Sequence, residues 1–243
     1  MNQLQDKIAI ITGGGSGIGK GIALAFAGEG CTVVLAGRTA PRLEAAAAEM
    51  RATGTEVLAV PTDVTDESQV IALFQTTMQR YGRLDLLVNS AGAFDGGPIE
   101  ELSLDAWNNV IGACLTGPFL CIREAFKIMK PAGGGRIINI GSISAQRSRA
   151  NSAPYTSSKF GVWGLTQAAA LEGRAYGISV GALHPGNTLV ERRSGSGKAS
   201  DDEPMIATEE MARVALLMAT LPPEANMLEA IVLPVEQLYI GRG

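Results

Sequence analysis

Short apolar runs alternate with longer segments of helical character along the whole chain. Most of the short runs are apolar at nearly every position, as in strands buried on both faces of a parallel sheet that helices cover. On this pattern we predict seven strands, at residues 7–12, 32–37, 56–60, 84–89, 136–141, 178–183 and 228–233.

The segments between the strands have the polarity and end signals of helices. Pro41 suits a first helical turn, acidic residues open the segment at 66–81, and the Gly117–Pro118 pair should kink a long helix. We predict six helices, at residues 17–30, 41–53, 66–81, 104–129, 153–176 and 208–221.

Regular alternation of strands and helices predicts an α/β fold with a doubly wound parallel sheet and helices on both faces. No linker or internal repeat divides the chain, so we expect one domain over residues 1–243. A (β/α)8 barrel is the main alternative at this length. It is disfavoured because seven strands are predicted rather than eight, and because the first strand leads directly into a glycine loop that opens a helix.

The composition of the chain disfavours several classes of binding partner. With 46% hydrophobic and 18% charged residues the chain is too apolar for disorder, and its net charge of −4 gives no general attraction for nucleic acid or anionic lipid. Cys31, Cys114, Cys121 and the single His184 show no zinc-ligand spacing, so we expect no metal, reduced cysteines and a locally packed histidine. We see no signal peptide and no run of about 18 apolar residues, and we therefore expect a cytoplasmic protein.

A glycine-rich loop joins the first strand to the first helix. Gly13 permits the tight turn, Gly17 lets backbone approach a pyrophosphate, and Gly19 lets the helix pack closely on the strand. An anion would then lie at the helix N-terminus. We expect the dinucleotide to contact Gly13, Gly15, Ser16, Gly17, Ile18 and Gly19.

The end of the second strand indicates which dinucleotide is bound. An acidic side chain there would accept hydrogen bonds from the ribose 2′-hydroxyl of NAD, but this chain has Gly37 followed by Arg38 and Thr39. A guanidinium suits a 2′-phosphate, and the threonine adds a hydroxyl. We therefore expect NADP(H) to be preferred over NAD(H).

Three residues have the types needed for hydride transfer to a carbonyl. Tyr155 and Lys159 are four positions apart and share a helix face, and Ser142 lies at the end of the fifth strand. Tyrosine has a free pKa of about 10, and lowering it to about 7 requires roughly 4 kcal/mol. We expect the Lys159 ammonium to lower the pKa of Tyr155 as acid and base, and Ser142 to position the substrate oxygen.

Together, the glycine spacing and the serine, tyrosine and lysine set resemble the short-chain dehydrogenase/reductase family over nearly the whole chain. The resemblance implies an oxidoreductase that interconverts small-molecule ketones and secondary alcohols. It also implies that Lys159 binds the cofactor ribose. Further cofactor contacts are implied at Asp63, Val64, Asn89, Ala91, Gly92, Tyr155, Pro185, Gly186 and Thr188.

Three positions depart from the family pattern. Ser16 stands where many NADP-preferring members carry a basic residue, and Cys114 stands where members typically have an asparagine that helps hold a water relay. Val190 replaces the usual threonine that binds the carboxamide, so Thr188 is the candidate replacement. These departures leave open a second interpretation, a catalytically weak or silent NADP(H) sensor. A dehydratase or epimerase is less expected, because those relatives usually carry an added substrate lobe.

Substrate specificity is expected in the loops at 93–102, 143–152 and 187–206. The last two carry cationic side chains that could attract an anionic substrate, namely Arg147, Arg149, Arg192, Arg193 and Lys198. The family resemblance also implies a homotetramer or dimer joined partly through the helices at 104–129 and 153–176, with the apolar tail at 233–243 packing on a neighbour.

Overall fold

The computed structural model describes residues 2–191 and 203–239. Their seven strands form one parallel sheet in the order β3-β2-β1-β4-β5-β6-β7, which confirms the predicted doubly wound class. The strands are β1 (Ile8–Thr12), β2 (Thr32–Gly37), β3 (Val57–Pro61), β4 (Leu86–Asn89), β5 (Gly135–Ile140), β6 (Ile178–Pro185) and β7 (Glu229–Val232).

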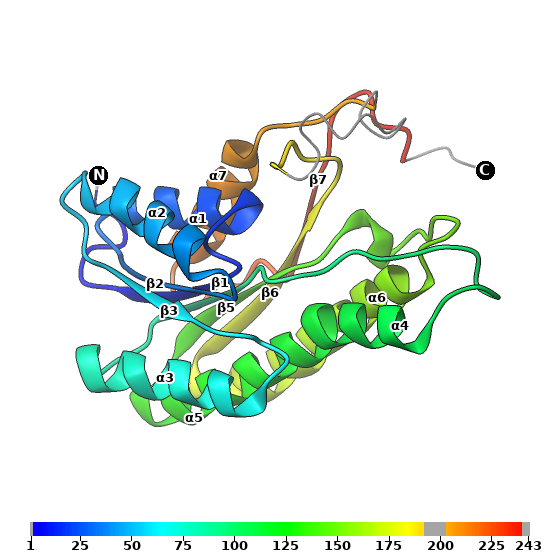
Figure 1. Cartoon of the computed structure of the whole chain (residues 1–243). Coiled ribbons are helices and arrows are strands. Elements are labelled where there is room, and N and C mark those ends of the chain that lie inside the picture. The colour runs from blue at the N-terminus through cyan, green and yellow to red at the C-terminus, as the bar shows by residue number, and fades with distance from the viewer. Residues whose placement is uncertain (1, 192–202, 240–243) are drawn as a thin grey trace.

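Helices cover both faces of the sheet (Figure 1). On one face lie α1 (Gly17–Gly28), α2 (Ala40–Arg51) and α7 (Thr208–Thr220), and on the other lie α3 (Glu67–Tyr81), α4 (Leu104–Ile111), α5 (Gly117–Ala132) and α6 (Ala153–Gly173). Two buried apolar clusters fill the two layers, so strands such as β1 are buried at every residue. None of the helices in the described ranges is long and apolar enough to span a membrane.

The prediction of one continuous helix at 104–129 is wrong in its detail. It consists of α4, a π-helical turn at Gly112–Thr116, and α5, which continues to Ala132. Pro118 lacks an N–H group and its ring would clash with the carbonyl one turn back, so the backbone widens into a π turn just before it. Gly117 N–H accordingly bonds the Gly112 carbonyl, five residues back.

Cysteine side chains serve the core, as the sequence indicates. Cys31 and Cys121 are free and fully buried, and burial raises the pKa of each thiol to about 12. Thiolates are the reactive form of cysteine, so these two side chains are suited to packing rather than chemistry.

The strand order reverses between β1 and β4, and this point indicates where along the carboxyl edge of the sheet a ligand would bind. β1 pairs with both β2 and β4, and from this point the chain winds outward in both directions. Ligands of open α/β sheets bind at the carboxyl ends of the strands beside such a switch point. The glycine loop after β1 and the segment after β4 both lie there.

Candidate active site

The glycine loop is built so tightly that side chains would not fit. Gly13 has φ +68°, and a Cβ there would lie 2.9 Å from both Ala91 N and Ser90 O. A Cβ on Gly19 would lie 2.5 Å from the Gly13 carbonyl oxygen, so α1 packs directly on the loop. The loop therefore lets backbone approach closely at the N-terminus of α1, a place that suits a phosphate group.

Polar side chains join this loop to the central strands. Thr12 Oγ1 accepts hydrogen bonds from Ser90 N and Ala91 N, both at 3.1 Å. Asn89 Nδ2 donates to Asn139 Oδ1, and Asn139 Nδ2 donates to Thr166 Oγ1, at 2.9 Å each. This buried chain of contacts fixes β4, β5 and α6 relative to one another at the edge that carries the site.

A cavity of about 210 Å³ lies beside the glycine loop, lined partly by Gly13, Gly15, Ser16, Arg38, Thr39, Asp63, Val64, Ala91 and Gly92. Half of the predicted cofactor residues, nine of eighteen, thus line one cavity. Asp63 Oδ1 accepts from the N–H and the hydroxyl of Thr65, which shapes the loop after β3.

Arg42 lines the same cavity and was missed by the sequence analysis. It lies in the first turn of α2, whereas Arg38 precedes the helix, so the spacing of neighbours on a helix face does not relate the two residues and gave no signal for Arg42. With Arg38 it supplies two guanidinium groups at the end of β2, although position 16 is a serine.

Tyr155 and Lys159 lie on the first two turns of α6 and share one face. Lys159 Nζ is 5.5 Å from the centroid of the Tyr155 ring, and the lysine is buried. Its Nζ donates to the Ile140 carbonyl oxygen at 2.8 Å, which ties the ammonium to the end of β5. Ser142 follows that strand by two residues, and its Oγ accepts from Ser144 N–H at 3.1 Å.

Cys114 does not face the lysine as a relay group. Its Sγ contacts both Ala93 N and Ala93 O, at 3.3 and 3.2 Å, from the π turn. A thiol is both a weak hydrogen-bond donor and a weak acceptor, so Cys114 can bond the N–H and the carbonyl of the residue that follows Gly92. The adjacent Phe94 packs edge-on against Tyr155, with ring centroids 5.2 Å apart, and remains half exposed.

The segment after β6 crosses the glycine loop. Thr188 is buried and its hydroxyl donates to the Gly186 carbonyl, while Val190 lies against Gly17. The Glu191 carboxylate accepts from Gly17 N–H at 2.9 and 3.2 Å. A side-chain anion therefore lies at the N-terminus of α1, where the sequence predicted the cofactor's anion.

Of the five cationic side chains predicted in the loops near the site, two lie in the described residues. Arg147 lies 5.7 Å from the centroid of the Tyr239 ring, and Arg149 is 3.9 Å from Glu203. Arg192, Arg193 and Lys198 fall outside the described residues. His184 is fully buried within β6, as its assignment to local packing required, and Trp163 on α6 contacts it edge-on at 5.6 Å.

Known proteins of similar sequence and structure share this architecture. The family model for short chain dehydrogenases matches residues 7–200. A 3beta-hydroxysteroid dehydrogenase of Mediterraneibacter gnavus is 39% identical over 198 residues, covering 80% of this chain and 71% of that protein. Levodione reductase of Leifsonia aquatica is 34% identical over 249 residues, covering 95% and 93%.

Solved structures agree with the sequence relatives. A metagenomic short-chain oxidoreductase in complex with NADP superposes with a TM-score of 0.85 at 31% identity, covering 97% of this chain and all of that one. A short-chain dehydrogenase/reductase of Mycobacterium marinum gives a TM-score of 0.89 at 28% identity over 95% of each chain. The chain belongs to the short-chain dehydrogenase/reductase family and is an oxidoreductase.

Proposed function

We propose that this enzyme uses NADP(H) to interconvert a small-molecule ketone and its secondary alcohol, and that residues 1–243 form one domain that binds cofactor and substrate. The observation that carries the proposal is the buried Lys159 ammonium beside the Tyr155 ring, at the sheet edge that holds the glycine loop.

The recess at the glycine loop fits a dinucleotide. Gly13, Gly15 and Ser16 line it, and Gly13 and Gly19 have no room for a side chain. When bound there, the nicotinamide cofactor would supply or accept the hydride at the substrate carbon. Its phosphates would lie against residues 13–19, and Lys159 would contact the nicotinamide ribose.

The chain's own residues handle the proton. In ketone reduction Tyr155 gives its phenolic proton to the substrate oxygen, and in alcohol oxidation the phenolate takes that proton back. Two positive groups lie beside this phenol: the Lys159 ammonium one turn along α6, and the N-terminus of that helix, whose first turn contains Tyr155. Ser142 keeps its proton and donates a hydrogen bond to the substrate oxygen, while its Oγ accepts from Ser144 N–H.

Two features support NADP(H) over NAD(H). No acidic side chain follows β2, and both Arg38 and Arg42 line the cavity beside the glycine loop. Guanidinium groups bind phosphate oxygens through charge-assisted, often bidentate hydrogen bonds. The metagenomic relative that binds NADP is in keeping with this assignment.

A surface groove supports a homo-oligomer. A cavity of about 420 Å³ between α5 and α6 is lined by apolar side chains including Phe119, Ile122 and Leu165. Lys127, Lys130 and Glu172 belong to the same lining, so charges of both signs surround an apolar centre. Such a surface can pair with a second copy of itself about a twofold axis.

Replacing Tyr155 by phenylalanine tests the proposed chemistry. We expect turnover with NADPH, across a panel of ketones, to fall at least ~10²-fold while the Kd for NADPH changes little, because only the proton donor is lost. The control is Tyr176→Phe, whose ring also lies beside a lysine, with Lys130 Nζ 4.4 Å from its centroid.

Two outcomes would contradict the proposal. Near-normal turnover of the Tyr155 variant would remove the tyrosine from the reaction. Tight NADPH binding by the wild type with no turnover of any ketone or alcohol would instead support the sensor interpretation.

A further inference from the structure

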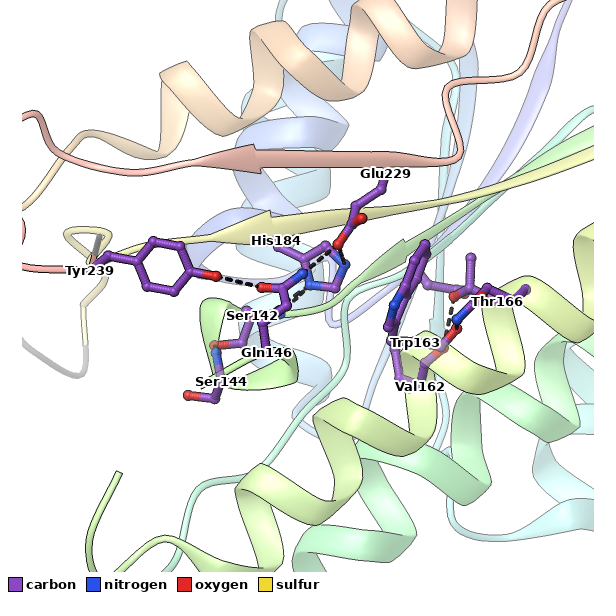
Figure 2. Close-up of polar contacts among 11 residues, drawn as sticks. Ser142, Ser144, Gln146, Val162, Trp163, Thr166, His184, Glu229 and Tyr239 are labelled. Atoms are coloured by element: carbon purple, nitrogen blue, oxygen red, sulfur yellow. Dashed lines mark hydrogen bonds and ion pairs between the residues drawn. The ribbon is translucent and has the colours of Figure 1, made fainter. Parts of the chain in front are cut away.

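A buried histidine lies directly behind the candidate serine. His184 on β6 is fully buried, and its Nδ1 is 3.2 Å from Ser142 N and 2.9 Å from Ser142 O. Gly141 makes this approach possible, because a Cβ there would lie 2.4 Å from the imidazole Nδ1. Nδ1 bonds one of these two backbone atoms at a time: without a proton it accepts from the Ser142 N–H, and with a proton it donates to the Ser142 carbonyl oxygen (Figure 2).

The loop that begins at Ser142 is held a second time at Gln146, four residues later. Gln146 Nε2 donates to Glu229 Oε1 on β7, and Tyr239 Oη donates to Gln146 Oε1 at 2.9 Å. Figure 2 shows these side chains converging from β6, β7, the loop after β5 and the C-terminal segment. Residues 142–146 are thus fixed at both ends by groups that belong to neither Tyr155 nor Lys159.

Glu229 also links the two ends electrostatically. Its Oε1 lies 3.5 Å from His184 Nε2, a buried nitrogen with no hydrogen-bond partner among the described residues. A carboxylate at that distance favours the tautomer with the proton on Nε2. The Nδ1 lone pair is then free to accept the Ser142 N–H.

The charge state of the imidazole agrees with this geometry. Burial lowers the pKa of His184 below its ordinary value, and the positive charge of Lys159 on α6 acts in the same direction. Two groups act in the opposite direction: the Ser142 carbonyl, to which a protonated Nδ1 would donate, and the charge of Glu229. The ring is therefore neutral near pH 7, and Glu229 decides which nitrogen carries its proton.

We propose that His184, oriented by Glu229, is a positioning residue that holds Ser142 so that its hydroxyl points at the substrate oxygen. The inference rests on the role proposed for Ser142. Because Ser142 Oγ rotates about a backbone that His184 fixes, loss of the imidazole would spread the hydroxyl over several directions without removing it.

A double-mutant cycle between His184 and Ser142 separates positioning from simple structural support. We expect His184→Ala to lower kcat about tenfold or more, with the Kd for NADPH within about twofold of wild type. We expect His184→Asn to recover much of the loss, since an amide can replace Nδ1. In Ser142→Ala the further change His184→Ala should have almost no effect, because the hydroxyl it positions is gone.

Multiplicative losses in the double variant would overturn the inference, as they would mean that His184 acts independently of Ser142. If Ser142→Ala itself keeps full turnover, the role proposed for Ser142 fails first. If Ser142→Ala is impaired and His184→Ala is not, only the positioning role fails.

A second pair of variants keeps the test decisive if His184→Ala does not fold. Glu229→Gln retains an acceptor for Gln146 and removes the charge beside Nε2, so we expect kcat to fall about threefold in the wild type and to stay unchanged in Ser142→Ala. An equal loss in both backgrounds, or no loss in either, would contradict the proposal.

Discussion

At the scale of single residues, the proposed preference for NADP(H) rests on two arginines that line the cavity beside the glycine loop. Arg38 follows β2 directly, and Arg42 lies one turn along α2 at the same cavity. We expect the pair to take the place of a basic residue at position 16, because a guanidinium suits a 2′-phosphate.

Arg38→Asp should weaken NADPH binding about 10- to 100-fold and leave NADH binding nearly unchanged or improved. Charge-assisted hydrogen bonds of this kind contribute about 1.5–3 kcal/mol each, and the aspartate would repel a phosphate but accept from a ribose hydroxyl. Calorimetry with both cofactors measures the change, and Arg42→Ala should show a smaller loss for NADPH alone.

Arg213→Ala, on an exposed part of α7, is the matched control for removal of one guanidinium. Equal affinities of the wild type for NADPH and NADH would contradict the assignment of cofactor.

The single histidine should make stability sensitive to mild acid. Its pKa is lowered from 6.5 by burial, so the folded state binds fewer protons than the unfolded chain at pH values below about 6.5. The stabilisation is present above that pH and is lost as pH falls toward the lower folded-state pKa. Urea unfolding at pH 7.5 and 5.5 should show a larger loss of unfolding free energy in the wild type than in His184→Asn.

No other histidine can account for such a difference, because the chain has only one. The same pH dependence in both proteins would show that the imidazole takes up its proton equally well when folded and when unfolded.

At the scale of elements, the segment after β6 acts on the N-terminus of α1. The Glu191 carboxylate accepts twice from Gly17 N–H, in the position suited to the cofactor's pyrophosphate. Two anions cannot share that helix end without repulsion, so we expect a bound dinucleotide to compete with this contact.

Glu191→Gln should therefore tighten NADPH binding about two- to fivefold. Charges at helix ends contribute about 0.3–1 kcal/mol, and the amide removes the competing charge while keeping the size of the side chain. The Kd for NADPH is the measurement, with Glu224→Gln as an exposed control of the same charge change. Weaker binding in the Glu191 variant would show that the carboxylate assists the cofactor instead.

The π turn at Gly112–Thr116 also acts on a neighbouring segment. It turns Cys114 toward the backbone of Ala93, so the cysteine stabilises the cofactor-side loop through two weak hydrogen bonds. The departure from the family's asparagine is therefore compatible with an ordered loop at this position.

At the scale of the whole molecule, the proposed homo-oligomer would form through the groove between α5 and α6. Phe119→Glu should shift the protein from an oligomer toward a monomer, because a charge would be buried in an apolar contact. Light scattering of the wild type and the variant measures the mass. Leu217→Glu, an equally exposed apolar position on α7, is the control and should leave the mass unchanged.

A monomeric wild type would contradict the oligomer directly. A Phe119 variant that keeps the wild-type mass would instead move the interface away from this groove.

The sequence by itself determined the parallel sheet, the glycine loop and the shared face of Tyr155 and Lys159. These features depend on local patterns: runs buried on both faces favour central strands, glycines allow a tight turn, and a spacing of four sets neighbours on a helix. Such rules act within a few residues, so they can be applied before any tertiary contact is known.

Only the tertiary structure decided which distant groups meet. Arg42 joins Arg38 at one cavity, His184 contacts Ser142 across 42 positions, and Glu191 reaches Gly17 across 174. Parallel pairing of strands brings loops from far apart in the chain to one edge, and the partners there depend on that pairing rather than on spacing in the sequence. For the same reason, Pro118 predicts a break in the helix but not its form. The structure shows that the backbone widens into a π turn, which directs Cys114 to Ala93.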